Sequence, residues 1–189
     1  MRGPRTAKQS TVSALAICFF ALTPLALVLP DHFLAGLPTL SSAVGAIGKV
    51  AGSVDKLGSV SDFPDPTRTV LAVCWLMCPF LMVWVYLGLS SERDEILAHY
   101  RRLRWKLLFL LPIMSYAFIW LPVSMHLLDP AKVEHGRSFF YMVVRAASHH
   151  RLGLGLLSSA FGFTVAVMTA LVMFCLLNSR SILLREKIQ

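Results

Sequence analysis

The sequence predicts an all-α membrane protein: a four-transmembrane-helix bundle with two amphipathic segments at the membrane interface on its outer side. Three observations favour this fold class. Hydrophobic residues make up 56% of the 189 residues, above the roughly 45–50% usual for soluble domains. Four apolar runs have the length of about 17–25 residues that crossing a hydrocarbon core requires. Lys and Arg gather near the ends of these runs, as they do beside the cytoplasmic ends of membrane spans.

The four apolar runs are predicted to be spans because none of them contains Lys, Arg, Asp or Glu. They cover residues 12–29, 70–89, 107–128 and 152–177. Little chain remains for another domain, so residues 1–189 are expected to form one polytopic unit. The first run is longer than the apolar core of a typical signal peptide, and we therefore expect an uncleaved first helix.

The connector between the second and third spans, residues 90–106, carries the strongest charge pattern. Acidic residues come first, and the basic residues that follow are Arg101, Arg102, Arg104 and Lys106. This order suits the helix dipole, and a basic cluster beside a span is typical of the cytoplasmic side, where it faces lipid headgroups. The two tails and the connector hold eleven Lys and Arg, against seven in the outer loops 30–69 and 129–151. Both termini are therefore expected in the cytoplasm.

The first outer loop contains an amphipathic segment over residues 40–57. At 100° per residue its apolar side chains gather on one side, while Gly45, Gly48 and Gly52 join serines and lysines on the other. Glycine weakens an isolated helix by about 1 kcal/mol relative to alanine, so a glycine side is useful where another backbone approaches. Two interpretations remain open: a re-entrant or surface-lying helix, and a docking helix whose glycine side meets a partner subunit.

The second outer loop begins with Asp129 and Pro130, which predict an N-cap and a first helical residue. A second amphipathic segment over residues 137–151 follows. Phe139 and Phe140 belong to its apolar side, and its polar side includes Arg137 and Arg145. A basic amphipathic helix with aromatic residues is typical of the membrane interface, so these four residues are candidates for docking at the interface or on a partner.

The fourth predicted span has small residues at helical spacing. A stripe of this kind permits close approach of helices inside a bilayer, which places this span at the centre of the predicted bundle. The stripe consists of Gly155, Ser159, Gly162, Ala166 and Ala170.

Histidine and cysteine could serve metal, haem or redox chemistry, or they could be structural. Five histidines are expected on the outer side, but no His-x-x-His or Glu-x-x-His spacing occurs there. All four cysteines lie within apolar runs, which suits buried cysteine as a small hydrophobic residue rather than a disulfide framework. We therefore expect no metal and no cofactor.

Catalysis and nucleic-acid binding also lack positive signals. No nucleophile elbow, phosphate-binding glycine loop or catalytic carboxylate pair occurs in the sequence, so the protein is not expected to be an enzyme. The net charge of +8 sits at span ends rather than in a nucleic-acid-binding module. Membrane lipids and other membrane protein subunits are therefore the expected partners.

The resulting functional hypothesis is an accessory or scaffold subunit of a multiprotein complex in a bacterial inner membrane, of the secretion or conjugative-transfer type. The single Asn and the excess of Arg over Lys suit a GC-rich bacterial genome. Residues 135–141 resemble a short Gly-Arg-x-Ser…Tyr stretch in membrane proteins of integrative conjugative elements, a local likeness that assigns no family. Two alternatives stay open: an immunity or exclusion protein acting through helix contacts within the bilayer, and a small channel or carrier lined by hydroxyl side chains.

Overall fold

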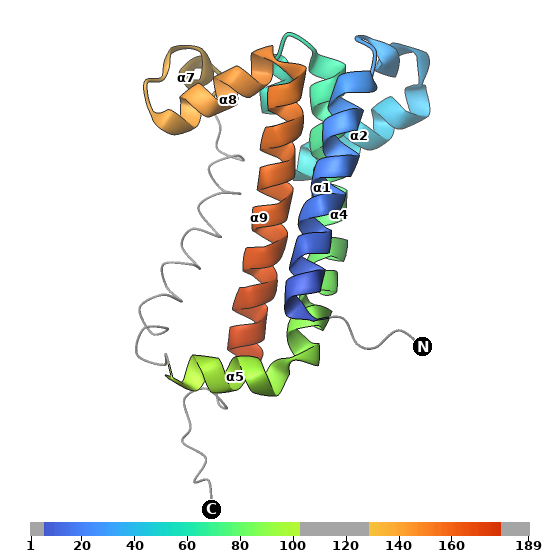
Figure 1. Cartoon of the computed structure of the whole chain (residues 1–189). Helices are drawn as coiled ribbons and strands as arrows, with labels where there is room; N and C mark the ends of the chain where they lie inside the picture. Colours follow the sequence, from blue (N-terminus) through green and yellow to red (C-terminus); the bar gives the residue numbers. More distant parts are fainter. Residues whose placement is uncertain (1–5, 103–128, 179–189) are drawn as a thin grey trace, which may run out of the picture.

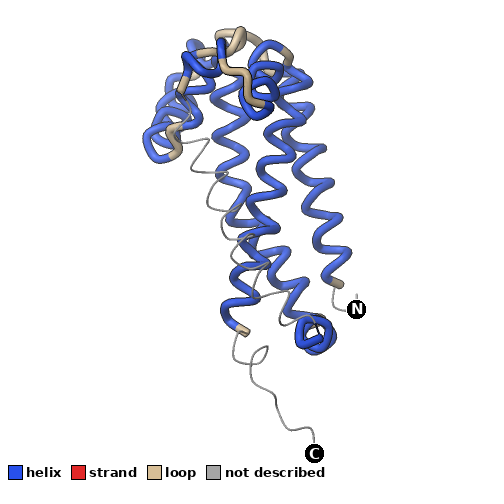
Figure 2. The backbone as a smooth tube through the Cα atoms, turned by 90° about the vertical axis from the view of Figure 1, so that its left-hand side faces the viewer, coloured by secondary structure: helices blue, strands red, loops and turns tan. Residues whose placement is uncertain are grey.

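The structure is a computed structural model that describes residues 6–102 and 129–178, and its regular elements over those ranges are helices (Figures 1 and 2). The upright bundle consists of α1 (Ala7–Val28), α4 (Pro64–Ser91) and α9 (Arg151–Leu177). Each of these three helices is long and apolar enough to cross a membrane. The helical prediction is thus confirmed for the described residues, and the fourth predicted span, 107–128, lies outside them.

The bundle helices start earlier than the apolar runs that predicted them. Helix α1 begins at Ala7 because the hydroxyl of Thr6 accepts a hydrogen bond from the backbone N–H of Gln9 at 3.2 Å, and the Gln9 side chain accepts one from the backbone N–H of Thr6. Helix α4 begins at Pro64, where the missing proline N–H leaves no intrahelical bond unmade. Hydropathy marks the apolar section of a helix, whereas capping residues determine where the helix starts.

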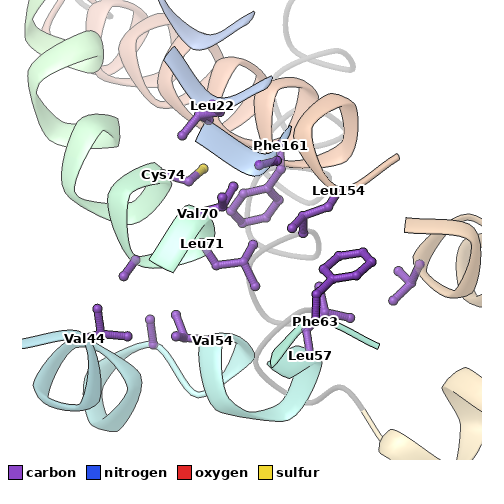
Figure 3. Packing of buried hydrophobic residues seen from close by; sticks show 14 of the residues in the cluster. Leu22, Val44, Val54, Leu57, Phe63, Val70, Leu71, Cys74, Leu154 and Phe161 are labelled. Atoms are coloured by element: carbon purple, nitrogen blue, oxygen red, sulfur yellow. The ribbon is translucent and has the colours of Figure 1, made fainter. Parts of the chain in front are cut away.

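Helix α9 packs against both α1 and α4, which also contact one another. We call the end of the bundle where α1 ends and α4 and α9 begin the cap end, and the opposite end the α5 end. One cluster of buried apolar residues lies towards the cap end and includes Leu22, Leu71, Leu154 and Phe161 (Figure 3). A second cluster, centred on Phe174, lies towards the α5 end. The two clusters hold the three helices together along their length.

Short helices flank the cap end on two sides. The first set is η1 (Phe33–Gly36), α2 (Pro38–Val50) and α3 (Ser53–Ser59). The second set, α7 (Pro130–His135) and α8 (Phe139–His149), lies away from α2 in Figure 1, and α7 contacts α3 of the first set. The predicted N-cap of α7 is confirmed, since the Asp129 carboxylate accepts from the backbone N–H of Ala131 at 3.1 Å.

The prediction of one continuous helix over residues 40–57 is wrong. Helix α2 ends at Val50, and the backbone of Ala51 leaves the helical region before α3 begins at Ser53. The break lets α3 bury Val54 and Leu57 in the cap-end cluster while α2 buries Val44 in the same cluster. Burial of these apolar side chains stabilises the two short helices, whereas glycines at 45, 48 and 52 weaken a continuous helix.

Helix α5 (Arg93–Arg102) crosses the opposite end of the bundle (Figure 1). Helix α4 ends before Glu92, which separates it from α5. The Glu92 carboxylate accepts a hydrogen bond from the backbone N–H of Ala7 at 3.0 Å, at the N-terminus of α1. The Arg93 guanidinium donates to the side-chain oxygen of Asn178 at 2.7 Å, just after α9 ends. The start of the predicted connector therefore ties together the ends of all three long helices, and its junction with residues 107–128 lies outside the described residues.

Candidate docking surfaces

The small residues predicted along the last span are buried inside the bundle. Gly155, Ser159, Gly162, Ala166 and Ala170 all have less than a tenth of their surface exposed. At Gly155 an added Cβ would lie 2.8 Å from the Cα of Thr23 in α1, so the two backbones approach each other closely. The Ser159 hydroxyl bonds the carbonyl of Gly155 at 2.7 Å and lies 3.1 Å from that of Cys18. This stripe is therefore occupied by contacts within the chain and is not available to a partner.

Three cysteine side chains meet α9 around Gly162. The Cys74 thiol donates to the carbonyl of Ser158 at 3.3 Å, and the Cys78 thiol approaches the carbonyl of Gly162 at 3.9 Å. A Cβ on Gly162 would lie 2.9 Å from the Cys74 sulfur and 3.7 Å from the Cys18 sulfur. Within the described residues all four cysteines are free thiols, and no group of His, Cys, Asp and Glu is arranged to hold a metal ion. The thiols fill the space that Gly162 leaves between the three helices.

The glycines of residues 40–57 separate into three different environments. A Cβ on Gly48 would run into the carboxylate of Asp55, and Gly52 lies at the break before α3. A Cβ on Gly45 would have nothing within 4 Å. Among the α-helical glycines that the structure describes, Gly45 is the one that faces open space. The conformational cost of this glycine is therefore not offset by a close approach of any residue that the structure describes.

The outward side of α2 carries small residues and one large apolar side chain, Val50, which is 82% exposed one turn beyond Ala46. Ser42, Ala43 and Ala46 are exposed there, beside Gly45 and the longer side chain of Lys49. The opposite side buries Val44 and Gly48 against α3 and α4. Helix α2 thus packs by one face only and leaves a face of small residues without a neighbour in the described chain. We call this surface the α2 face: Ser42, Ala43, Gly45, Ala46 and Lys49.

A hydrogen bond fixes the depth of the α2–α3 junction along the bundle. The Trp75 indole N–H donates to the Ser53 hydroxyl at 3.2 Å. Trp75 lies about 16 Å along α4 from Pro64, at 1.5 Å per residue, and five residues inside the apolar run that starts at Val70. The bond therefore joins the α2–α3 junction to α4 at a residue inside the apolar run of α4.

Helix α8 does not divide into the predicted apolar and polar sides. Val144, Ala147 and Ser148 are buried, whereas Phe139 is 82% exposed. Arg145, predicted on the outward polar side, is half-buried and donates to the carbonyls of Val133 at 2.7 Å and of Gly136 at 3.1 Å. The prediction failed because the unpaired carbonyls of α7 attract the guanidinium inward. The two remaining candidates also differ, since Arg137 is exposed and Phe140 packs partly against the cap-end cluster.

Arg151 joins the start of α9 to the end of α1, a role that the sequence analysis missed. Its guanidinium donates to the carbonyl of Leu27 at 3.2 Å, to that of Leu29 at 2.5 Å and to the Asp31 carboxylate at 2.7 Å. It also lies 5.7 Å from the ring centroid of Phe63. A cation at these C-terminal carbonyls satisfies orphan acceptors and complements the helix dipole. No sequence motif marks this contact, because it joins residues more than 120 positions apart.

The charged candidates for lipid contact are only partly described. Arg101 and Arg102 belong to the last turn of α5, whereas Arg104 and Lys106 lie outside the described residues. Of the histidines expected on the outer side, His149 lies 2.9 Å from the Asp62 carboxylate, which links α8 to the segment before α4. His126 lies outside the described residues.

Comparison with known proteins finds no relative: no family model, no curated protein and no solved structure matches the chain.

Proposed function

We propose that this chain is a non-catalytic scaffold subunit of a multiprotein membrane complex, and that the α2 face is where a helix of a neighbouring subunit docks. The observation that carries the proposal is the open space at Gly45, beside the exposed small residues Ser42 and Ala46. Small residues mark the places where helices meet in a bilayer, because they let two backbones approach closely.

The depth of α2 supports a helical partner for this face. Helix α2 leads into the junction that the bond between Ser53 and Trp75 joins to α4 five residues inside its apolar run. A helix that faces only acyl chains is expected to carry large apolar side chains, and α1 shows this pattern with exposed Phe19, Phe20 and Val28. The α2 face carries none within its five residues, and Val50 at its end is the one large apolar side chain exposed on that side of α2. A close-packing protein surface suits it better than lipid does.

The channel and carrier alternative has less support. A polar path would need hydroxyl side chains of the spans, but Thr23 and Ser159 lie 3.5 Å apart at the α1–α9 contact. Ser159 also bonds backbone carbonyls, and both residues are buried. Hydroxyl groups engaged in this way hold helices together and are not free to line a path for water or ions.

The proposed setting is a bacterial inner membrane, with both termini in the cytoplasm and the complex of the secretion or conjugative-transfer type. The distribution of Lys and Arg supports this orientation, with eleven in the tails and connector and seven in the outer loops. The cap end, with α2 and α8, then lies at the outer surface, and α5 lies at the cytoplasmic surface.

The test is extraction of the tagged protein from its native membrane in mild detergent, followed by identification of what accompanies it. A defined, stoichiometric set of partners is expected from the native chain and should be lost from Gly45→Leu, whose side chain fills the α2 face. Ala160→Leu is the matched control, because Ala160 is an exposed small residue of α9, and it should retain the partners. A native chain that purifies alone refutes the proposal and favours the alternative of an immunity protein, which binds its target only when that target is present.

A further inference from the structure

Helix α8 exposes an apolar stripe on a part of the bundle that lies away from α2 in Figure 1. Phe139 is 82% exposed and Met142 is 56% exposed, and Ala146 continues the exposed positions one turn further along the helix. Helical spacing puts these three residues on one side of α8. The stripe has no covering neighbour among the described residues, although it contains two large apolar side chains.

Two polar groups of α8 bond to other parts of the protein, whereas His149 at its end remains exposed beside Asp62. Arg145 donates to the carbonyls of Val133 and Gly136 in the α7 region. The Ser148 carbonyl accepts from the Asp62 backbone N–H at 3.1 Å and from the Ser61 hydroxyl at 3.0 Å. A surface helix in water presents its polar side outward, whereas α8 presents Phe139 and Met142. Apolar surroundings suit the part of this side that carries Phe139 and Met142.

The position of α8 along the bundle gives the depth of the stripe. A single residue, His150, separates α8 from α9, and it is both the C-cap of one helix and the N-cap of the next. The exposed apolar surface of α9 begins at Leu152, which is 52% exposed, and continues at Leu156. Helix α8 extends sideways from this point (Figure 1). The stripe on α8 thus continues the lipid-facing surface of α9 at the edge of the membrane.

We infer that the α8 stripe, Phe139, Met142 and Ala146, inserts into the lipid of the leaflet at the cap end, at the boundary between acyl chains and headgroups. Aromatic and sulfur-containing side chains partition favourably into this layer, which amphipathic helices occupy to a depth of about 5–10 Å. Exposed Arg137, just before α8, then lies at the level of the lipid phosphates. This surface is separate from the α2 face, and the inference does not depend on a partner subunit.

Spin labels test the inference in the full-length chain reconstituted in vesicles of phosphatidylethanolamine and phosphatidylglycerol. Phe139→Cys and Met142→Cys place the label on the stripe, and Glu134→Cys on α7 is the matched exposed control. The four native cysteines are buried, and the unsubstituted protein, treated in parallel, gives the background labelling. Collision of the label with oxygen reports lipid, and collision with a water-soluble nickel chelate reports water.

The expected result is an oxygen-to-nickel accessibility ratio several-fold higher at 139 and 142 than at 134. A ratio at 139 and 142 equal to that at 134 would place the stripe in water and overturn the inference. Immobile labels that neither reagent reaches would show that protein covers the stripe, which would also overturn it. Ala146→Cys, which changes a smaller side chain, provides the same measurement if the larger substitutions prevent folding.

Discussion

Replacement of Arg151 by methionine should destabilise the cap end while keeping most of the apolar stem of the side chain. The native guanidinium makes three hydrogen bonds, at 3.2 and 2.5 Å to the carbonyls of Leu27 and Leu29 and at 2.7 Å to the Asp31 carboxylate. The variant loses all three. These bonds join the start of α9 to the end of α1, so their loss should lower the stability of the folded chain.

The magnitude follows from the exposure of the groups involved. The Asp31 side chain is 53% exposed, so its ion pair contributes only about 0.2–1 kcal/mol. Hydrogen bonds from a charged donor to the two carbonyls contribute about 1.5 kcal/mol or more, and the interaction with the dipole at the end of α1 adds about 0.3–1 kcal/mol. The free energy of unfolding should fall by about 2–3 kcal/mol.

The assay is reversible unfolding of the purified protein in mild detergent by added SDS, followed by tryptophan fluorescence. Arg151→Lys should lie between the native chain and Arg151→Met, because a lysine keeps the charge but cannot bond both carbonyls and the carboxylate with one planar group. Arg137→Met makes the same chemical change at an exposed position and should change stability by less than about 0.5 kcal/mol. Equal effects of Arg151→Met and Arg137→Met would refute the assignment of Arg151 as the link between α9 and α1.

Three further substitutions test separate contacts. Gly45→Ala should raise the free energy of unfolding of the isolated chain by about 0.5–1 kcal/mol in the same assay, since the added methyl group meets nothing within 4 Å; a loss of stability would contradict the open space. Gly162→Ala should lower the free energy of unfolding by about 1 kcal/mol, because the added Cβ lies 2.9 Å from the Cys74 sulfur. When Gly162→Ala is combined with Cys74→Ala, the total loss should be smaller than the sum of the two single losses. Arg145→Met should speed trypsin cleavage after Lys132 and Arg137 several-fold, because α7 loses both bonds to the guanidinium; unchanged cleavage with unchanged folding would show that Arg145 does not hold α7.

The three bundle helices could be predicted from the sequence because their signal is local. A run such as residues 152–177 contains no charged side chain, and length and hydropathy alone favour a membrane-spanning helix. The N-cap at Asp129 could be predicted for the same reason, since the side chain bonds a backbone group only two residues away. The start of α1 at Ala7 was missed because the helix extends beyond its apolar section.

The features that could not be predicted depend on contacts between distant residues. Whether Gly155 faces a partner or α1 is decided by how α9 is rotated against Thr23, and a helical wheel gives only the spacing of the small residues. The inward turn of Arg145 depends on where the α7 carbonyls lie. The break after Val50 depends on the burial of Val54 and Leu57 in the cap-end cluster. Each of these is a tertiary effect that overrides a local pattern.

The proposed scaffold role rests on a partner helix that docks on the α2 face. Quantitative recovery of co-purified partners from native membranes, for the native chain, Gly45→Leu and Ala160→Leu side by side, tests it most directly. Docking on this face predicts stoichiometric partners with the native chain and Ala160→Leu, and their loss from a Gly45→Leu protein that remains folded. Partners retained in full by Gly45→Leu, or absent from the native chain, would contradict it.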